Sequence, residues 1–239
     1  MKKPEDYIVF PLDLKVRDRA MSYVRMLKGH VGLYKVGLEL FISQGPDIIK
    51  SIRDEGDAGI FLDLKLHDIP ATVKRAFMAA SLHGPDFVTV HCDEGGGMLK
   101  EVADNNPGGT KILGITLLTS LNQNNLLKLG YAKEYAEDLS RMVLLRARTA
   151  KEAGCHGIVC SGHEVAEVKK ELGPDFIAVT PGIRPSWSIV GMDDQKRVVT
   201  PADAVRKGAD YIVVGRPIRD AKDPAGAAIK VAEEIASAL

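Results

Sequence analysis

The sequence has few cysteines, no excess charge of either sign and no long apolar run. Its three cysteines are too few for a disulfide framework and match no common zinc spacing, so we expect reduced, structural thiols and no metal. Lys plus Arg and Asp plus Glu each number 32, so any anion site must be local. No stretch has the length that crosses a membrane. These absences predict a soluble cytoplasmic protein that binds neither nucleic acid nor membrane.

The sequence does contain a regular alternation of strand and helix patterns along 239 residues, 45% of them hydrophobic. Short β-rich runs stand at 7–12, 31–36, 59–64, 87–91, 111–117, 157–160, 176–180 and 211–214, and amphipathic helical stretches include 16–27, 71–82, 131–153, 164–172, 201–207 and 225–239. This alternation requires parallel pairing, and eight units favour a closed barrel over an open sheet. We therefore predict an α/β fold in which residues 1–239 form one (β/α)8 TIM-barrel catalytic domain.

One segment, from Phe61 to Pro70, places charges at the end of a buried strand. Because residues alternate between the faces of a strand, we expect Asp63 and Lys65 to point the same way. Asp68 follows on a turn before a helix start and is free to reach elsewhere. A surface ion pair is the alternative interpretation of this spacing. The surrounding strand-helix repeat, with a second lysine at the end of the preceding strand, favours a site.

Polar side chains follow the other predicted strands at the same end. These residues are Asp13, Lys35, His91, Thr119, Ser120, Arg184 and Arg216. In a TIM barrel the loops after the carboxyl ends of the strands carry the chemistry. We therefore expect these residues to surround one site, with His91 interpreted as a hydrogen-bonded core histidine.

The loops after the last two predicted strands have the composition of a phosphate site. Glycine lets backbone N–H groups approach an anion, and arginine supplies a planar set of donors. Gly182 and Arg184 follow the seventh strand, and Gly215 and Arg216 follow the eighth, which is the usual phosphate position in this fold. An exposed Arg216 beside a turn glycine is the alternative, and the pairing of the two loops favours phosphate.

Four motifs together resemble the orotidine 5′-monophosphate decarboxylase family. They are DLKLHDIPAT at 63–72, TPGIR at 180–184, DQKRVVTP at 194–201 and VGRPI at 214–218, and the resemblance covers essentially the whole chain. It implies a homodimeric (β/α)8 barrel that converts orotidine monophosphate to uridine monophosphate and carbon dioxide, in pyrimidine biosynthesis, without metal or organic cofactor.

The resemblance also implies roles for individual residues. Lys65 would donate a proton to the pyrimidine carbon that loses carbon dioxide, Asp63 would lie against the departing carboxylate, and Lys35 would pair with Asp63 and touch the ribose. Asp68 and Thr72 would complete the site of the partner subunit. The further substrate contacts would be Asp13 at the ribose, Ile69, Thr119 or in its place Ser120 at the base, and Pro181, Arg184, Gln195, Gly215 and Arg216 toward the base and phosphate end.

Two other functions are compatible with parts of this pattern. Metal-dependent sugar-phosphate decarboxylases or aldolases share the Asp-x-Lys-x-x-Asp spacing and use Mg²⁺, although the Ile-Pro-Ala-Thr continuation argues against them. A non-catalytic phosphate-ligand binding protein would not need the Asp-Lys-Asp array.

Residues 182–195 form a long polar connection that contains one tryptophan, Trp187. We interpret this connection as a lid that closes over the substrate phosphate. The alternative is that Trp187 lies in the core.

Overall fold

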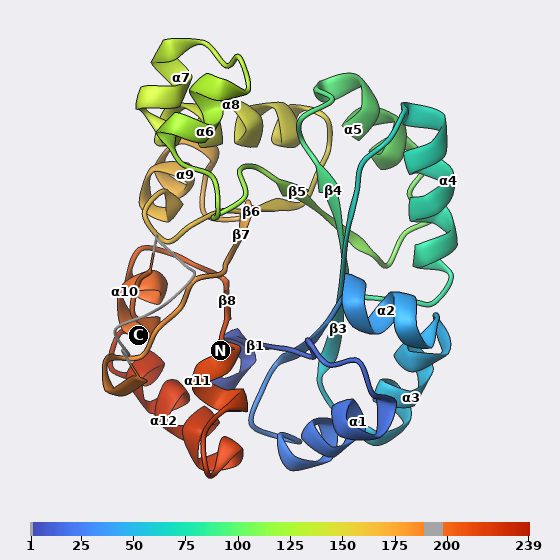
Figure 1. Cartoon of the computed structure of the whole chain (residues 1–239), viewed down its shortest axis with the longest axis vertical. Helices are drawn as coiled ribbons and strands as arrows, with labels where there is room; N and C mark the ends of the chain where they lie inside the picture. The colour runs from blue at the N-terminus through green and yellow to red at the C-terminus, as the bar shows by residue number, and fades with distance from the viewer. Residues whose placement is uncertain (1, 189–197) are drawn as a thin grey trace.

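The eight strands close into a parallel barrel in which each strand pairs with the next and β1 pairs with β8 (Figure 1). The computed structural model describes residues 2–188 and 198–239. The strands are β1 (Ile8–Pro11), β2 (Leu33–Gly37), β3 (Gly59–Leu66), β4 (Phe87–His91), β5 (Lys111–Ile115), β6 (Gly157–Val159), β7 (Ile177–Thr180) and β8 (Tyr211–Val213). The fold confirms the TIM barrel predicted from the alternating pattern.

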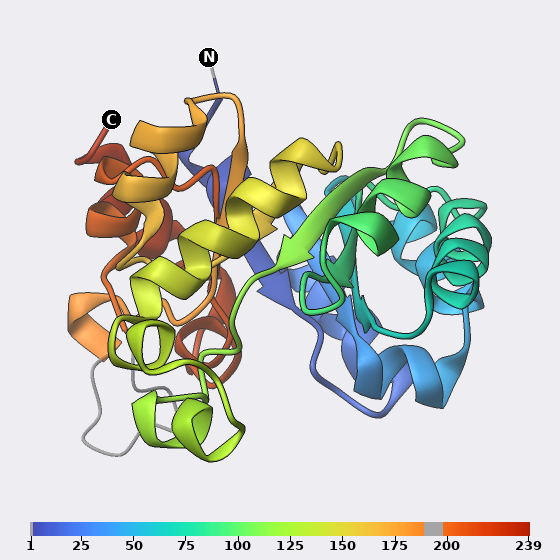
Figure 2. The ribbon, with the colours of Figure 1, turned by 90° about the horizontal axis from the view of Figure 1, so that it is seen from above.

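The helices surround this ring of strands. The α-helices are α1 (Arg17–Met26), α2 (Leu38–Gln44), α3 (Asp47–Glu55), α4 (Pro70–Ser81), α5 (Gly96–Asp104), α6 (Gln123–Lys128), α7 (Lys133–Glu137), α8 (Leu139–Glu152), α9 (Val165–Leu172), α10 (Pro201–Arg206), α11 (Arg216–Arg219) and α12 (Pro224–Ala236), and short 3-10 turns are η1 (Pro4–Tyr7) and η2 (Ser186–Ser188). Figure 2 shows both chain ends at one face of the barrel and α6 and α7 at the other. No helix in the described ranges is long and apolar enough to cross a membrane.

The single helix predicted over 131–153 is wrong, because the chain forms α7 and α8 with a break at Asp138. Asp138 has an extended backbone, and its carboxylate accepts hydrogen bonds from the N–H groups of Ser140 and Arg141. Aspartate at this position satisfies N–H groups that the first turn of a helix leaves without partners. The amphipathic pattern continues across the break, so it did not indicate the new helix start. The other predicted elements agree with the structure within a few residues.

Two apolar cores follow from the alternation of side chains along the strands. Val9, Leu33, Phe61, Phe87, Leu113 and Val179 fill the inside of the barrel. Their neighbours on the strands, such as Ile8 and Phe10, pack outward against the helices. The strands are therefore buried on both faces, as expected for a parallel barrel. The three cysteines are buried, as expected for structural thiols.

Strand β3 departs from regular geometry where its charged residues begin. Leu62 pairs with Val88 and Leu66 pairs with Val90, so β3 advances four residues where β4 advances two. Within this bulge Lys65 has φ +50°, a left-handed conformation that non-glycine residues adopt rarely. The bulge lies at the carboxyl end of β3 and sets the direction of the side chains there.

Candidate active site

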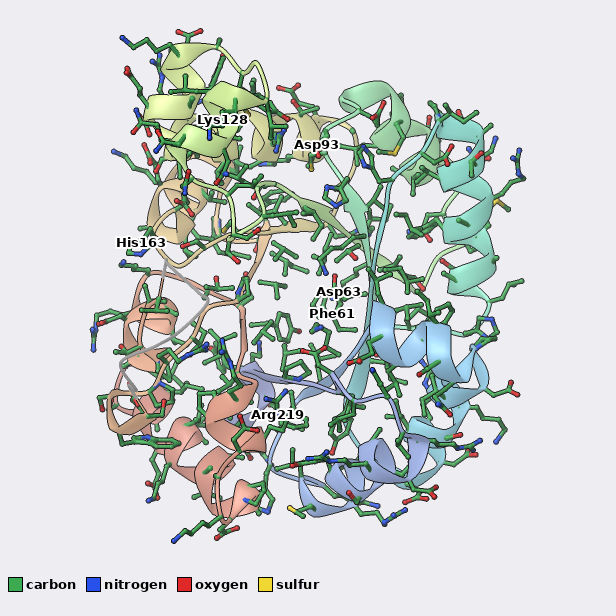
Figure 3. The ribbon with its side chains drawn as sticks, viewed as in Figure 1. Phe61, Asp63, Asp93, Lys128, His163 and Arg219 are labelled. Atoms are coloured by element: carbon green, nitrogen blue, oxygen red, sulfur yellow. The ribbon has the colours of Figure 1, made fainter. Side chains whose placement is uncertain are left out.

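A cavity of about 530 Å³ opens at the carboxyl ends of the strands. Most of the residues predicted for the site line it: Asp13, Lys35, Asp63, Lys65, Thr119, Pro181, Gly182, Arg184, Gly215 and Arg216. Figure 3 shows Asp63 and Phe61 near the middle of the ring of strands, with Arg219 on the side of α11. Strands far apart in the sequence therefore bring the predicted charges together at one face.

The charged wall of the cavity is centred on the carboxylate of Asp63. Oδ2 of Asp63 lies 2.6 Å from Nζ of Lys65 and 3.5 Å from Nζ of Lys35. Lys35 also contacts Oδ1 of Asp13 at 3.1 Å. The chain thus forms a continuous array, Asp13–Lys35–Asp63–Lys65, of alternating sign, in which the two ends, Asp13 and Lys65, are more open to solvent than the two middle members.

Attraction within the array outweighs the cost of burying its charges. Burial alone would raise the pKa of the Asp63 carboxyl, but the charges of Lys35 and Lys65 hold the pKa below its ordinary value. Burial alone would lower the pKa of Lys35, but Asp63 and Asp13 hold that pKa above its ordinary value. The Asp63 and Lys35 side chains are therefore both charged at neutral pH.

Regular strand alternation is not what brings Asp63 and Lys65 together, which corrects the geometric part of the prediction. The bulge and the positive φ of Lys65 interrupt the period of two between these residues. The Lys65 backbone N–H bonds to the side chain of Thr89 on β4, and the ammonium returns to Asp63. The ion pair predicted from the spacing is present, and the bulge supplies its geometry.

The opposite side of the cavity is rich in arginine. Arg184 follows β7 and Arg216 follows β8, as predicted, and Gly182 between β7 and Arg184 has φ +78°, which glycine adopts without strain. Arg219, which sequence reasoning missed, also lines the cavity, and its guanidinium pairs with Asp220 at 2.7 Å. Its spacing of three residues from Arg216 is the sequence signal for a shared helix face in α11.

An apolar wall lies between the charged array and the arginines. It consists of Ile115, Leu117, Leu118, Val159 and Pro181, with Thr119 beside it. Thr119 lines the cavity, whereas Ser120 is exposed and does not. These apolar side chains can pack against a flat, uncharged ring that lies between the two charged ends of the cavity.

Three residues that were predicted to contact the substrate do not line the cavity of their own chain, and a fourth falls outside the described residues. Ile69 is exposed (66%), and Asp68 is exposed with its Oδ1 accepting the backbone N–H of Ile69 at 2.7 Å. Thr72 is half-buried on α4. Gln195 falls outside the described residues. Asp68, Ile69 and Thr72 thus share one segment that leads away from the cavity.

His91 is a partnered histidine, as predicted. Its Nδ1 lies 3.3 Å from Oδ2 of Asp93, and its ring packs 5.0 Å from that of His67. Asp93 in turn pairs with Arg146, and Figure 3 shows Asp93 well apart from Asp63. Among residues 2–188 and 198–239, no group of three or more His, Cys, Asp or Glu side chains could hold a metal ion.

The closed parallel barrel with a polar cavity at the carboxyl ends of its strands defines the class, a (β/α)8-barrel enzyme. The chain belongs to the orotidine 5′-phosphate decarboxylase / HUMPS family, whose model matches residues 6–231. This confirms the family and the class of enzyme predicted from the four motifs.

Individual relatives match over nearly their full length. The chain is 49% identical to the orotidine 5′-phosphate decarboxylase of Desulfosudis oleivorans, covering 100% of this chain and 96% of the relative. It is 43% identical to the enzyme of that name from Syntrophus aciditrophicus, with the same coverage of both chains. The crystal structure of orotidine 5′-phosphate decarboxylase from Lactobacillus acidophilus superposes with a TM-score of 0.81 at 35% identity, covering 95% of this chain and 98% of that one.

Proposed function

We propose that the protein is an orotidine 5′-monophosphate decarboxylase that forms uridine 5′-monophosphate and carbon dioxide in pyrimidine biosynthesis. Family membership and the decarboxylases that match the whole chain support the reaction. The observation that carries the proposal is the Lys65–Asp63 ion pair in the wall of a cavity that three arginines also line. A substrate with a carboxylate at one end and a phosphate at the other matches this distribution of charge.

The substrate would lie across the cavity with its phosphate toward the arginines. Arg184 and Arg216 would hold the phosphate by charge-assisted hydrogen bonds, with the backbone at Gly215 close by and Gln195 as a further contact. The pyrimidine would lie against the apolar wall beside Thr119 and Pro181. Asp13 and Lys35 would bind the ribose hydroxyl groups, and this leaves the substrate carboxylate beside Asp63 and Lys65.

Lys65 would carry the chemical step. When the bond between the ring carbon and the carboxylate breaks, its electron pair stays on the ring carbon and carbon dioxide leaves. A fixed ammonium beside that carbon stabilises the developing negative charge, most strongly in a site that excludes water. Lys65 then transfers one N–H proton to the carbon, which completes uridine monophosphate, and the neutral amine regains a proton from solvent.

Asp63 would have two roles in this scheme. Its carboxylate lies 2.6 Å from the Lys65 ammonium and would hold that ammonium in place for proton donation. It would also lie against the substrate carboxylate, and repulsion between the two negative groups is relieved when carbon dioxide departs. The pKa of Asp63, held below its ordinary value, keeps the side chain charged for both roles.

The active unit would be a homodimer in which Asp68, Ile69 and Thr72 enter the site of the partner subunit. The support is their position: Asp68 and Ile69 are exposed, and the segment follows the β3 residues of the array while leading away from their cavity. Within the described residues, the Asp68 carboxylate accepts a hydrogen bond from the N–H of the adjacent Ile69 and from no other group. A second copy of the chain would place its Asp68 beside Lys65, next to the other charges of the array.

An assay with orotidine monophosphate, with and without EDTA, tests this function. We expect one uridine monophosphate and one carbon dioxide per substrate, with turnover unchanged by EDTA and absent in Lys65→Ala. Activity lost in EDTA and restored by Mg²⁺ would instead support the metal-dependent class. Binding of uridine monophosphate without any consumption of substrate would support a non-catalytic binding protein.

A further inference from the structure

Thr89 connects the two central residues of the active site through one side chain. It lies on β4, is fully buried and is not among the residues that line the cavity. Its hydroxyl donates a hydrogen bond to Oδ1 of Asp63 at 3.0 Å and accepts one from the backbone N–H of Lys65 at 2.8 Å. One oxygen atom thus contacts both members of the ion pair.

The direction of these two hydrogen bonds is fixed by chemistry. A charged carboxylate can only accept, and a backbone N–H can only donate. The single hydroxyl hydrogen of Thr89 therefore points to Asp63, and its lone pairs face Lys65. Because Oδ2 of Asp63 is held by the lysines, the bond to Oδ1 fixes the remaining rotation of the carboxylate.

Thr89 also stands where the β3–β4 ladder is interrupted. The pairs Leu62 with Val88 and Leu66 with Val90 leave three residues of β3 opposite Thr89 alone. Within this gap the Lys65 N–H bonds to the Thr89 side chain. The hydroxyl takes the place that a carbonyl of the neighbouring strand has in a regular ladder.

The conformation that this contact holds is an unusual one. Lys65 is the only non-glycine residue with positive φ in the described ranges. Such a conformation persists where surrounding contacts determine it. Thr89 is one of those contacts, and it acts directly on the residue whose ammonium must reach the reacting carbon.

We propose that Thr89 is a positioning residue, which holds the Lys65 backbone and the Asp63 carboxylate in the relative orientation that decarboxylation requires. This inference rests on the proposed function, because it takes the roles of Asp63 and Lys65 from it. Thr89 touches no substrate atom. Its effect is therefore on the chemical step, with little effect on substrate binding at the arginine end of the cavity.

The test compares Thr89→Val, which keeps the shape and removes the hydroxyl, with Thr89→Ser, which keeps the hydroxyl. Thr110→Val is the matched control, since Thr110 is also buried and donates to the carbonyl of Pro85 at 2.9 Å, before β5 at the opposite end of the barrel. We expect Thr89→Val to lower kcat by about 10- to 100-fold, with KM and the affinity for uridine monophosphate within about threefold of the wild type. Thr89→Ser and Thr110→Val should keep most of the activity.

The pH profile gives a readout that loss of packing does not move. The hydrogen bond from Thr89 is among the contacts that lower the pKa of Asp63, against burial, which raises it. In Thr89→Val the acid limb of kcat should therefore shift to higher pH, and in Thr110→Val it should not. Thr89→Ala gives the same comparison if the valine variant does not fold.

The outcomes separate this inference from the function on which it rests. Wild-type protein that does not turn over orotidine monophosphate overturns the proposed function and the role of Thr89 with it. Active wild type with an equally active Thr89→Val, or with equal losses in the valine and serine variants, overturns the inference about Thr89 alone. A loss confined to Thr89→Val, with the shifted acid limb, supports it.

Discussion

Nζ of Lys65 lies 2.6 Å from Oδ2 of Asp63, two residues earlier on the same strand, and the backbone of Lys65 has φ +50°. In a regular strand two such residues stand side by side on one face, about 6.5 to 7 Å apart along the chain. Here β3 bulges between them, and the lysine side chain closes back on the carboxylate. The same strand thus supplies both the carboxylate and the ammonium of the array.

Lys65→Ala should lower kcat by about a thousandfold or more, because Lys65 is assigned to charge stabilisation and proton donation in the transition state. The affinity for uridine monophosphate should change by no more than about tenfold, since Lys65 is not assigned to the phosphate. Single-turnover kinetics and calorimetric titration measure the two quantities. Lys100→Ala, which removes an exposed helix ion pair with Asp104, is the control. An alanine variant with wild-type turnover would remove Lys65 from the mechanism.

Mixing Lys65→Ala with Asp68→Ala should restore activity if Asp68 enters the partner's site. In a mixed dimer one site then contains both intact residues and the other contains both substitutions. At equal concentrations and full exchange, half of the dimers are mixed, so we expect about a quarter of the wild-type activity. Subunit exchange is checked by mass spectrometry of the mixed species. No recovery despite exchange would assign Asp68 to the site of its own subunit.

The charge coupling between Lys35 and Asp63 should appear in the pH dependence of stability. Burial opposes both charges, yet the pKa of Asp63 is lowered and that of Lys35 is raised. Asp63 therefore stabilises the fold fully above its unfolded pKa of about 3.9, and this contribution is lost as the pH falls through the lower folded value. The contribution of Lys35 is complete below about pH 10.4 and is lost as the pH rises through the higher folded value.

Lys35→Met should therefore be less stable than the wild type by about 3 kcal/mol near neutral pH, because it leaves a buried carboxylate with one cation fewer. The difference should be constant between about pH 5 and 9 and should shrink outside that range. Urea denaturation at a series of pH values measures it. Lys50→Met, at an exposed pair with Asp54, should show no such profile. A difference that grows toward acid pH would contradict the assigned coupling.

Orotidine, which lacks the phosphate, should react with a far lower kcat/KM than its monophosphate if phosphate binding energy is used to assemble the closed site. An exposed ion contact accounts for no more than about fivefold, so a loss of several orders of magnitude is expected. Added phosphite dianion should restore part of the rate. Arg216→Ala should slow the monophosphate and leave orotidine unaffected.

The lid prediction for 182–195 is only partly within the described residues, which include Trp187 and end at 188 before resuming at 198. Trp187 is 44% exposed, with the ammonium of Lys230 5.8 Å from its ring centre, so the core alternative is wrong. Its fluorescence should change when uridine monophosphate binds. An unchanged signal, together with orotidine reacting as well as its monophosphate, would contradict the lid.

The sequence by itself determined the barrel, the family and the set of charges at one end of the strands. The strand and helix periods are local properties, and parallel pairing of eight such units leaves few other arrangements. Asp13, Lys35, Asp63 and Lys65 were identified because charges at the ends of buried strands need partners or a function. Arg219 was missed because its place in the cavity wall depends on how α11 packs at the cavity.

Only the tertiary structure decided how those residues meet. The bulge in β3, the positive φ of Lys65 and the hydroxyl of Thr89 between the two strands depend on pairs that are 24 to 26 residues apart in the chain. The period of apolar residues indicates the face of a strand on which a side chain lies. It does not indicate where the pairing register between two strands shifts. The break at Asp138 has a local origin, since a helix cap interrupts the helix while the apolar pattern continues. Long-range strand register and local capping are set by contacts that a sequence period does not contain.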